Sequence, residues 1–307
     1  RFLTFNFSYA ILIVRKPQGI GSQFMQHERV SENVYWFQSE IYAQVTASAV
    51  IGPQWAVLID TLIPQETEEL RDYIVNELLV PVKYIINTHH HADHSWGNCF
   101  FPRAIVIGHT LCHELMVTRS SSALAEAGET SQFYRNLDII PPHITLSEGT
   151  LGLRVGKKQL QIFPTPGHTP DSISVLLEDE RILFAGDAFM PIPYVVGGDA
   201  DVLTETIRRI GSLGLENIIQ GHGDIILRGE IEESVKSNLA YLHTIQRVAK
   251  TAARRKNQIR YLDQHDIEVC GKSRVALAGT AQELHRKNLI WLTQIYQSQI
   301  KAEKEQT

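Results

Sequence analysis

The chain has 307 residues, of which 43% are hydrophobic and 21% charged, and its formal net charge is −5 at pH 7. This composition is typical of a globular protein with a sizeable core, arranged as one large domain or two smaller ones. The acidic balance argues against a nucleic-acid partner, because nucleic-acid-binding proteins usually carry a basic surface.

The first 24 residues are predicted to be an N-terminal extension. Residues 2–14 are apolar and aromatic, but a membrane span needs about 20 apolar residues, so we expect no membrane partner. The three cysteines are too few for a disulfide framework and fit a reducing cytosol, so we expect a cytoplasmic protein. If the apolar stretch is instead a cropped signal peptide, the protein is periplasmic or secreted.

Strands and helices are predicted to alternate along the chain. Runs of apolar, β-branched and aromatic residues predict strands over 34–37, 44–51, 55–60, 82–87, 103–108, 160–163, 172–177, 181–185 and 217–220. Apolar residues at helical spacing predict helices over 66–79, 110–126, 203–210, 231–242 and 284–295, with Asp201 as the N-cap of the third. The mixed spacing indicates an α/β fold with substantial antiparallel content, followed by helices alone.

The main chemical signal follows strand 82–87, in the consecutive residues His89, His90, His91, Ala92, Asp93 and His94. Imidazole and carboxylate groups are typical ligands of zinc and related divalent ions. Alternation along the loop directs His89 and His91 to one side and lets Asp93 and His94 turn to another, which can serve two metal positions. His90 then points away and is interpreted as a structural hydrogen-bonding residue. Cys99, a little further on, is either a soft ligand or a small buried residue.

Three later segments share one pattern, an apolar strand followed by a glycine turn that carries a ligand-type residue. They are Gly167-His168, Gly186-Asp187 and Gly221-His222. Glycine permits a tight turn and a close approach of the backbone to a metal. One such dipeptide is weak support for a metal site, but three in order after the histidine cluster are strong support.

Together these motifs resemble those of the metallo-β-lactamase superfamily, over roughly residues 30–230. The resemblance implies an αβ/βα four-layer sandwich of two mixed β-sheets with outer helices and a metal site at one edge. We therefore predict a catalytic domain over 25–230 and a C-terminal helical extension, 231–307, packed on it. The implied ligands are His89, His91 and His168 for the first metal, Asp93, His94 and His222 for the second, and Asp187 as the bridge. Asp60 resembles a buried family aspartate that orients a ligand imidazole, and Thr88 could serve similarly.

The resemblance also implies a dinuclear hydrolase with two Zn²⁺ per chain, or Fe or Mn in their place. Asp187 and the histidine after Asp93 resemble the glyoxalase II, lactonase and phosphodiesterase branches more than the zinc β-lactamases. A hydroxide bridging the metals would cleave a small ester, lactone or thioester, with Asp93 orienting it and returning the proton to the leaving group. Tyr194 is either an oxyanion donor, as in lactonase relatives, or a packed loop aromatic.

Other activities stay open alongside the hydrolase. They are a zinc β-lactamase, an iron-dependent oxygenase of the persulfide dioxygenase type, and a non-catalytic binding scaffold. We expect a small-molecule substrate and an apolar wall formed by Pro191, Pro193, Val195 and Val196. The C-terminal helices are expected either to cover the site or to form the surface of a homodimer.

Overall fold

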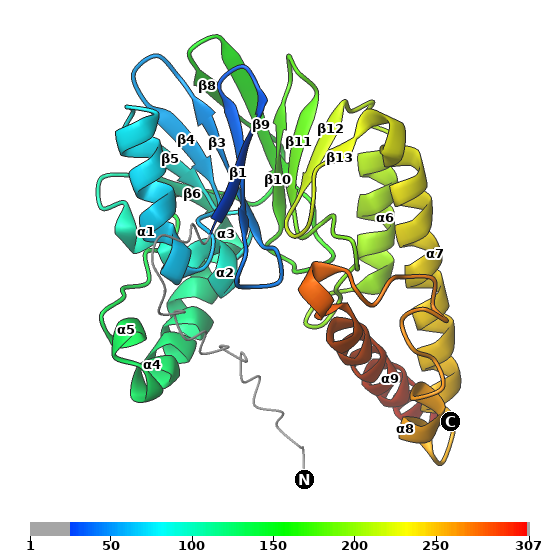
Figure 1. Cartoon of the computed structure of the whole chain (residues 1–307). Coiled ribbons are helices and arrows are strands. Elements are labelled where there is room, and N and C mark those ends of the chain that lie inside the picture. The colour runs from blue at the N-terminus through cyan, green and yellow to red at the C-terminus, as the bar shows by residue number, and fades with distance from the viewer. Residues whose placement is uncertain (1–24, 306–307) are drawn as a thin grey trace.

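The computed structural model describes residues 25–305 as two β-sheets packed face to face, with helices on both outer sides (Figure 1). The predicted αβ/βα sandwich of mixed sheets is therefore confirmed. The predicted N-terminal extension, residues 1–24, and with it the signal-peptide alternative, lies outside the described residues.

The first sheet contains seven strands in sequence order. Its first half is antiparallel, and the last three pairings are parallel. The strands are β1 Met25–Ser31, β2 Val34–Ser39, β3 Thr46–Ile51, β4 Ala56–Ile59, β5 Val82–Ile86, β6 Ile105–His109 and β7 Ile144–Leu146. The sequence did not predict β1 or β7, which form the two edges of this sheet.

The second sheet contains six strands in the order β13-β12-β11-β10-β9-β8, and only β11 and β12 pair in parallel. The strands are β8 Leu151–Val155, β9 Lys158–Pro164, β10 Ile173–Leu177, β11 Ile182–Gly186, β12 Asn217–Gln220 and β13 Ile226–Leu227. Again the two edge strands, β8 and β13, are the ones that the sequence did not predict. Edge strands are short or partly exposed, so their apolar signal is weak.

A dry core lies between the two sheets. It joins Trp36 and Ile86 of the first sheet to Ile162, Val175 and Phe184 of the second. Successive side chains of a strand point to opposite faces, so the other face of each central strand needs its own cover. Every residue of β10 and β11 is buried, because helices cover the face that turns away from the other sheet.

The helices divide between the two outer sides, with α1 to α5 beside the first sheet and α6 to α9 beside the second (Figure 1). Their bounds are α1 Pro64–Asp72, α2 Ala92–Ser95, α3 Thr110–Leu115, α4 Ser121–Thr130, α5 Gln132–Arg135, α6 Ala200–Gly211, α7 Arg228–Ala253, α8 Gln258–Leu262 and α9 Ala281–Glu305. Short π-helical or 3-10 segments also occur over Tyr73–Glu77, Trp96–Phe100, Met116–Ser120 and Leu277–Gly279. Among residues 25–305, no helix combines the length and apolar content needed to cross a membrane.

One predicted helix cap is wrong. The side chain of Asp199, not that of Asp201, accepts hydrogen bonds at the start of α6, from the backbone nitrogens of Asp201 and Val202 at 2.8 and 3.0 Å. The helix begins at Ala200, and a capping carboxylate must stand just before the first helical residue. Asp201 lies inside the first turn.

The C-terminal helices share one apolar cluster with the second sheet. It includes Leu203 and Ile207 of α6, Leu242 of α7 and Leu289 of α9. The boundary predicted at residue 230 falls in the first turn of α7, which begins at Arg228.

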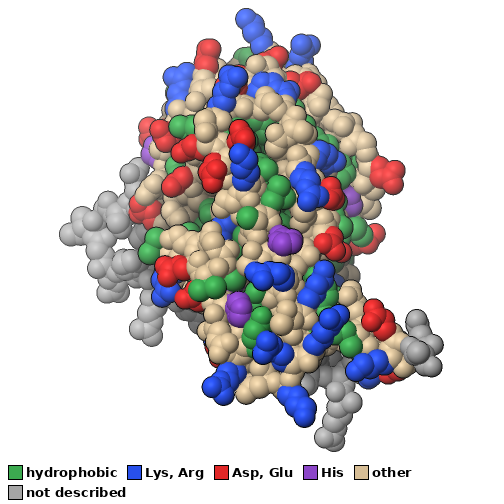
Figure 2. All heavy atoms as spheres, turned by 90° about the vertical axis from the view of Figure 1, so that its right-hand side faces the viewer, with side chains coloured by type: hydrophobic (Ala, Val, Ile, Leu, Met, Phe, Trp, Pro, Cys, Tyr) green, Lys and Arg blue, Asp and Glu red, His purple; other side chains and the backbone are tan. Residues whose placement is uncertain are grey.

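Lys and Arg side chains gather over the lower part of the face that carries α6 and α7 (Figure 2). Two cations at the end of α7 lie on aromatic rings, since Lys250 is 5.1 Å from the ring centre of Tyr296 and Arg255 is 4.1 Å from that of Tyr261. Such cation–π contacts tie the end of α7 to α8 and α9.

Glu66 is a buried acid in the first turn of α1. Its Oε1 accepts a hydrogen bond from the backbone nitrogen of Glu40 at 3.3 Å, while Oε2 has no hydrogen-bond partner within residues 25–305. Burial raises the pKa of this carboxyl from 4.5 to about 7. Between these pH values the folded chain keeps a proton that the unfolded chain releases, so stability falls as pH rises through this window.

We therefore expect Glu66→Gln to raise the free energy of unfolding at pH 8 by about 1–3 kcal/mol and to change it little at pH 4.5. Urea unfolding at both pH values measures the difference. Glu77→Gln, an exposed control in the following π-helical turn, should leave the pH dependence unchanged. An equal gain from Glu66→Gln at both pH values would contradict the role of ionisation.

Candidate metal centre

The seven predicted ligand residues follow strand ends that meet at one edge of the two sheets. The histidine loop follows β5 of the first sheet, while His168, Asp187 and His222 follow β9, β11 and β12 of the second. These three strands point the same way, because β9 and β11 are each antiparallel to β10, and β12 is parallel to β11. Their carboxyl ends therefore bring three separate turns to one place.

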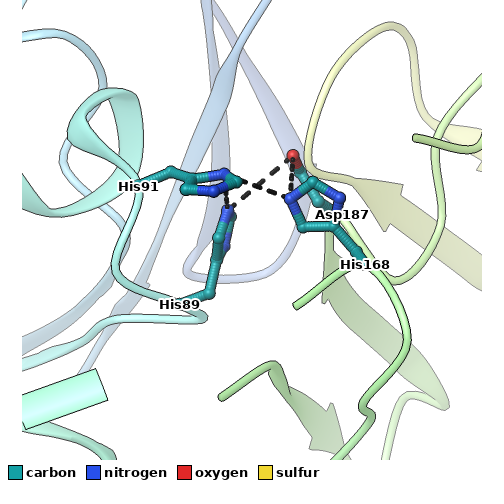
Figure 3. Close-up of side chains that lie close together, drawn as sticks. All are labelled: His89, His91, His168 and Asp187. Carbon is teal, nitrogen blue, oxygen red and sulfur yellow. Dashed lines mark hydrogen bonds and ion pairs between the residues drawn. The ribbon is translucent and has the colours of Figure 1, made fainter. Parts of the chain in front are cut away.

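Four of these side chains form a first group, shown in Figure 3. One ligand atom from each of His89, His91, His168 and Asp187 lies within 4.8 Å of the others. His91 Nδ1 is 2.9 Å from His89 Nε2 and 3.1 Å from His168 Nε2. His89 and His91 reach the centre from the loop after β5, and His168 and Asp187 reach it from the opposite side (Figure 3).

The other three side chains, Asp93, His94 and His222, form a second group. One ligand atom from each again lies within 4.8 Å of the others. Asp93 Oδ2 lies 3.4 Å from His222 Nε2 and 3.8 Å from His94 Nε2. Asp187 reaches both groups, since its Oδ1 is 3.3 Å from His94 Nε2 and its Oδ2 is 3.3 Å from His168 Nε2. The structure thus brings all seven residues together in the partition that the family resemblance implies, while their role as metal ligands stays a prediction.

The donor atoms fit a pair of divalent cations. His94 Nε2 and Asp187 Oδ1 are buried and have no hydrogen-bond partner within the described part of the chain. Buried polar atoms without a partner are rare and call for an explanation, and a cation between the two groups would supply the missing partner. Imidazole and carboxylate donors suit zinc, iron and manganese.

Most of the inward-facing imidazoles are oriented through their other ring nitrogen. Nδ1 of His168 lies 2.8 Å from the carbonyl of Tyr194, and Nδ1 of His222 lies 2.9 Å from the carbonyl of Ala43. A carbonyl only accepts, so both Nδ1 atoms donate, and in the neutral form of each ring Nε2 has a lone pair that faces the centre. Nδ1 of His94 is 2.8 Å from Oδ2 of Asp60, which is the predicted contact.

The histidine loop is held from below by two buried carboxylates. Asp60 accepts from the backbone nitrogen and the hydroxyl of Thr88 at 2.8 and 2.7 Å, and that hydroxyl lies 3.1 Å from His89 Nδ1. Asp171 accepts from the backbone nitrogen of His90 at 2.8 Å, and its Oδ1 lies 3.0 Å from Nδ1 of the same residue. The predicted structural role of His90 is therefore confirmed. Asp171 was not predicted.

The buried charges divide the site into two kinds of histidine. Burial lowers the pKa of His89 and His91 well below the usual histidine value, and it lowers the pKa of His168 too. Burial opposes protonation of His94 and His222 as well, but the carboxylates of Asp187 and Asp93 outweigh it and raise both pKa values. The imidazoles of the first group are therefore neutral, whereas neighbouring carboxylates favour the protonated form of the imidazoles in the second group.

The same imidazoles act on Asp187. Burial alone would raise the pKa of its carboxyl, but His222, His94 and His168 hold that pKa well below its usual range. The carboxylate is thus ionised, which is the form that binds a cation.

Glycine allows two of the strand-end turns to approach each other. Gly186 has a φ of +51°, and a Cβ at this position would collide with the side chain of Thr88. A Cβ at Gly221 would overlap Oδ1 of Asp187. The predicted need for glycine beside Asp187 and His222 is therefore confirmed.

The turn between β2 and β3 is a part of the site that the sequence did not indicate. Ala43 and Gln44 have φ values of 44° and 52°, in the left-handed region that non-glycine residues rarely adopt. Besides the bond from His222 to Ala43, the backbone nitrogen of Gly223 donates to the carbonyl of Gln44 at 2.9 Å. Local strain here is offset by bonds that fix the last predicted ligand.

Two tyrosines lie beside the metal centre. Tyr194 is half-buried, with its ring centre 5.9 Å from that of His168, and it packs against the apolar cluster of α6, α7 and α9. Its role as an oxyanion donor stays a prediction. Tyr42 was not predicted, although the carboxylate of Asp93, together with burial and Tyr194, raises the pKa of its hydroxyl well above the usual value. No sequence motif marks Tyr42, because it lies in an irregular turn.

The apolar wall predicted after Asp187 is wrong in part. Pro193 and Val195 are buried, and Val195 belongs to the core under the loop. Alternation along an extended loop turns these two residues inward and leaves Tyr194 between them. Cys99 belongs to neither ligand group among residues 25–305, and burial raises the pKa of its thiol, which disfavours the metal-binding thiolate.

Comparisons with known proteins agree with this geometry. A family model described as metallo-beta-lactamase superfamily matches residues 43–222, a span that holds all seven predicted ligands. The mitochondrial persulfide dioxygenase ETHE1 of Mus musculus is 30% identical over 135 residues, which are 44% of this chain and 43% of that protein. A hydroxyacylglutathione hydrolase of Cereibacter sphaeroides is 28% identical over 176 residues, which are 56% of this chain and 60% of that protein. The chain thus spans about half the length of these relatives.

Solved structures share the fold. A metallo-beta-lactamase family protein from Thermus thermophilus superposes with a TM-score of 0.62 at 22% identity, covering 84% of this chain and 93% of that one. At this identity the likeness establishes the architecture alone.

The contacts of the histidine loop with its two buried carboxylates lead to a paired prediction. We expect His90→Ala to lower the free energy of unfolding by about 3 kcal/mol, because it removes the imidazole partner of the buried Asp171, and to keep the metal content. Asp60→Ala should instead weaken metal binding by about 10- to 100-fold, because Asp60 orients His94. Denaturant unfolding and elemental analysis separate the two effects. Loss of a full metal equivalent in His90→Ala would contradict this assignment.

Proposed function

Because the chain belongs to the metallo-β-lactamase superfamily, we propose that it is a metal-dependent hydrolase of a small ester, lactone or thioester. The observation that carries the proposal is the convergence of seven ligand-type side chains in two groups, with Asp187 in reach of both. The match to a hydroxyacylglutathione hydrolase gives further support for acyl-bond chemistry.

The proposed cofactor is a pair of Zn²⁺ ions, with Fe or Mn as alternatives. His89, His91 and His168 would hold the first ion, Asp93, His94 and His222 the second, and Asp187 would bridge them. When bound, such ions supply Lewis acidity and a water whose pKa is lowered from ~15.7 to about 7. Three neutral imidazoles leave the charge of the first ion undiminished, while the carboxylates offset the repulsion between the two cations.

Asp93 is the proposed proton-transfer residue of the hydrolysis. Its Oδ2 lies near His94 and His222, and 16% of its side chain is exposed, against 4% for Asp187. A substrate can therefore meet Asp93 while Asp187 stays enclosed. We propose that the carboxylate of Asp93 orients the attacking water, accepts its proton and returns the proton to the leaving group.

An iron-dependent oxygenase is the second candidate, and one observation favours it. The mouse persulfide dioxygenase is among the relatives with 30% identity. That match covers 44% of this chain, and the second ligand group argues for two metals rather than one. A zinc β-lactamase remains a third alternative.

The test is elemental analysis of the purified chain, with a substrate panel run on the same sample. The panel holds lactones, thioesters, aryl esters, a phosphodiester, a β-lactam and a persulfide with oxygen uptake recorded. We expect two metal equivalents per chain and hydrolysis of an ester, lactone or thioester that a chelator abolishes. One iron per chain with persulfide-dependent oxygen uptake would replace the hydrolase by the oxygenase.

We expect Asp187→Ala to lose metal and activity together, with hydrolysis reduced by at least about 100-fold, because this residue is the one shared by both groups. Asp201→Ala, an exposed aspartate on α6, is the matched control and should change neither. Stoichiometry is read by elemental analysis after gel filtration. Two metals retained by Asp187→Ala would show that Asp187 is not the bridge.

A further inference from the structure

The loop after β11 links the metal centre to the C-terminal helices. It runs from Asp187 to the start of α6 and carries Tyr194, whose carbonyl accepts from Nδ1 of His168 at 2.8 Å. That bond fixes which nitrogen of His168 faces the other ligands. The position of the Tyr194 peptide group therefore determines how this imidazole is aimed.

Asn288 of α9 holds the residues on either side of Tyr194. Its Oδ1 accepts from the backbone nitrogen of Val195 at 2.9 Å, and its Nδ2 donates to the carbonyl of Pro193 at 2.8 Å. The same Nδ2 lies 3.2 Å from the hydroxyl of Tyr241 on α7. Asn288 is fully buried, so its amide has no water as an alternative partner.

Asn238 of α7 makes a similar contact further back in the loop. Its Nδ2 donates to the carbonyl of Met190 at 3.1 Å, and its Oδ1 accepts from Nζ of Lys272 at 2.6 Å. Asn238 is also buried, with 2% of its surface exposed. Two asparagines from two helices thus hold the loop at three backbone positions.

Packing alone does not require amides at these places. Leucine has a similar volume and would fit the apolar cluster that surrounds both asparagines. The loop's buried peptide groups, however, need hydrogen-bond partners, and an asparagine offers one donor and one acceptor to an extended backbone. The amides therefore fix the loop's position as well as filling space.

We propose that Asn288, assisted by Asn238, is a positioning residue of the metal centre, through which α9 and α7 hold Tyr194 so that His168 faces the first metal. This inference rests on the proposed metal site. The C-terminal helices are thus part of the apparatus that holds the first ion, although they contribute no ligand from among the described residues.

The direct test compares Asn288→Leu with Thr293→Val on the same helix. Thr293 is buried and donates only to the carbonyl of Leu289 within α9, so its loss weakens the helix without touching the loop. The readouts are the rate at which bound zinc passes to a chromophoric chelator and the free energy of unfolding. We expect one of the two ions to leave about 10-fold faster from Asn288→Leu, and both ions to leave Thr293→Val at the wild-type rate. Asn238→Leu should give a smaller acceleration, because Met190 is further from Tyr194.

Equal release rates in wild type, Asn288→Leu and Thr293→Val would overturn the inference while leaving the hydrolase proposal intact. A wild-type chain that binds no metal would overturn both.

If Asn288→Leu does not fold, hydrogen exchange in the unmodified protein tests the inference instead. Coupling between two sites is reciprocal, so metal loading must slow exchange of the Val195 amide, which donates to Asn288. The Thr293 amide serves as the reference. Equal exchange of the Val195 amide with and without metal would overturn the inference.

Discussion

The structure depends on the burial of several imidazoles and carboxylates at one edge of two sheets. Asp60 and His94 are each at most 3% exposed, and Asp171, His89 and His168 are fully buried. An ionised group in such a place is costly unless it is paired and hydrogen-bonded. Four buried imidazoles meet this requirement in the same way, because one ring nitrogen has a hydrogen-bond acceptor and the other faces the shared ligand centre. Metal binding would complete the pairing.

The main supports of the site lie far in sequence from the residues that they hold. Carbonyls of the β2–β3 turn and of the loop after β11 fix His222 and His168, while Asp60 and Asp171 fix the histidine loop. Backbone strain occurs at some of these supports, since Ala43, Gln44 and Asp60 all have positive φ. Strained residues persist where the surrounding bonds over-determine them, which is the case here.

The family model ends at residue 222, at the last predicted ligand, yet the molecule continues as one structure. The apolar cluster that contains Leu203 and Phe189 also contains residues of α7 and α9. Inside this cluster the amide groups of Asn238 and Asn288 reach the loop beside Asp187. A helical addition to a common fold can in this way adjust a metal centre without providing a ligand.

The sequence by itself determined the central strands, parts of the long helices and the seven ligand-type residues, because apolar periodicity and glycine turns are local signals. Strand 217–220, for example, agrees residue for residue with β12. The four missed strands, β1, β7, β8 and β13, are the edges of the two sheets, where partial exposure erases the apolar pattern. Apart from Asp60 and Thr88, only the tertiary structure decided the supports of the site. A carbonyl at Ala43 or Tyr194 has no side-chain signature, and Asp171 or Asn288 gains its role from a partner that only folding brings beside it.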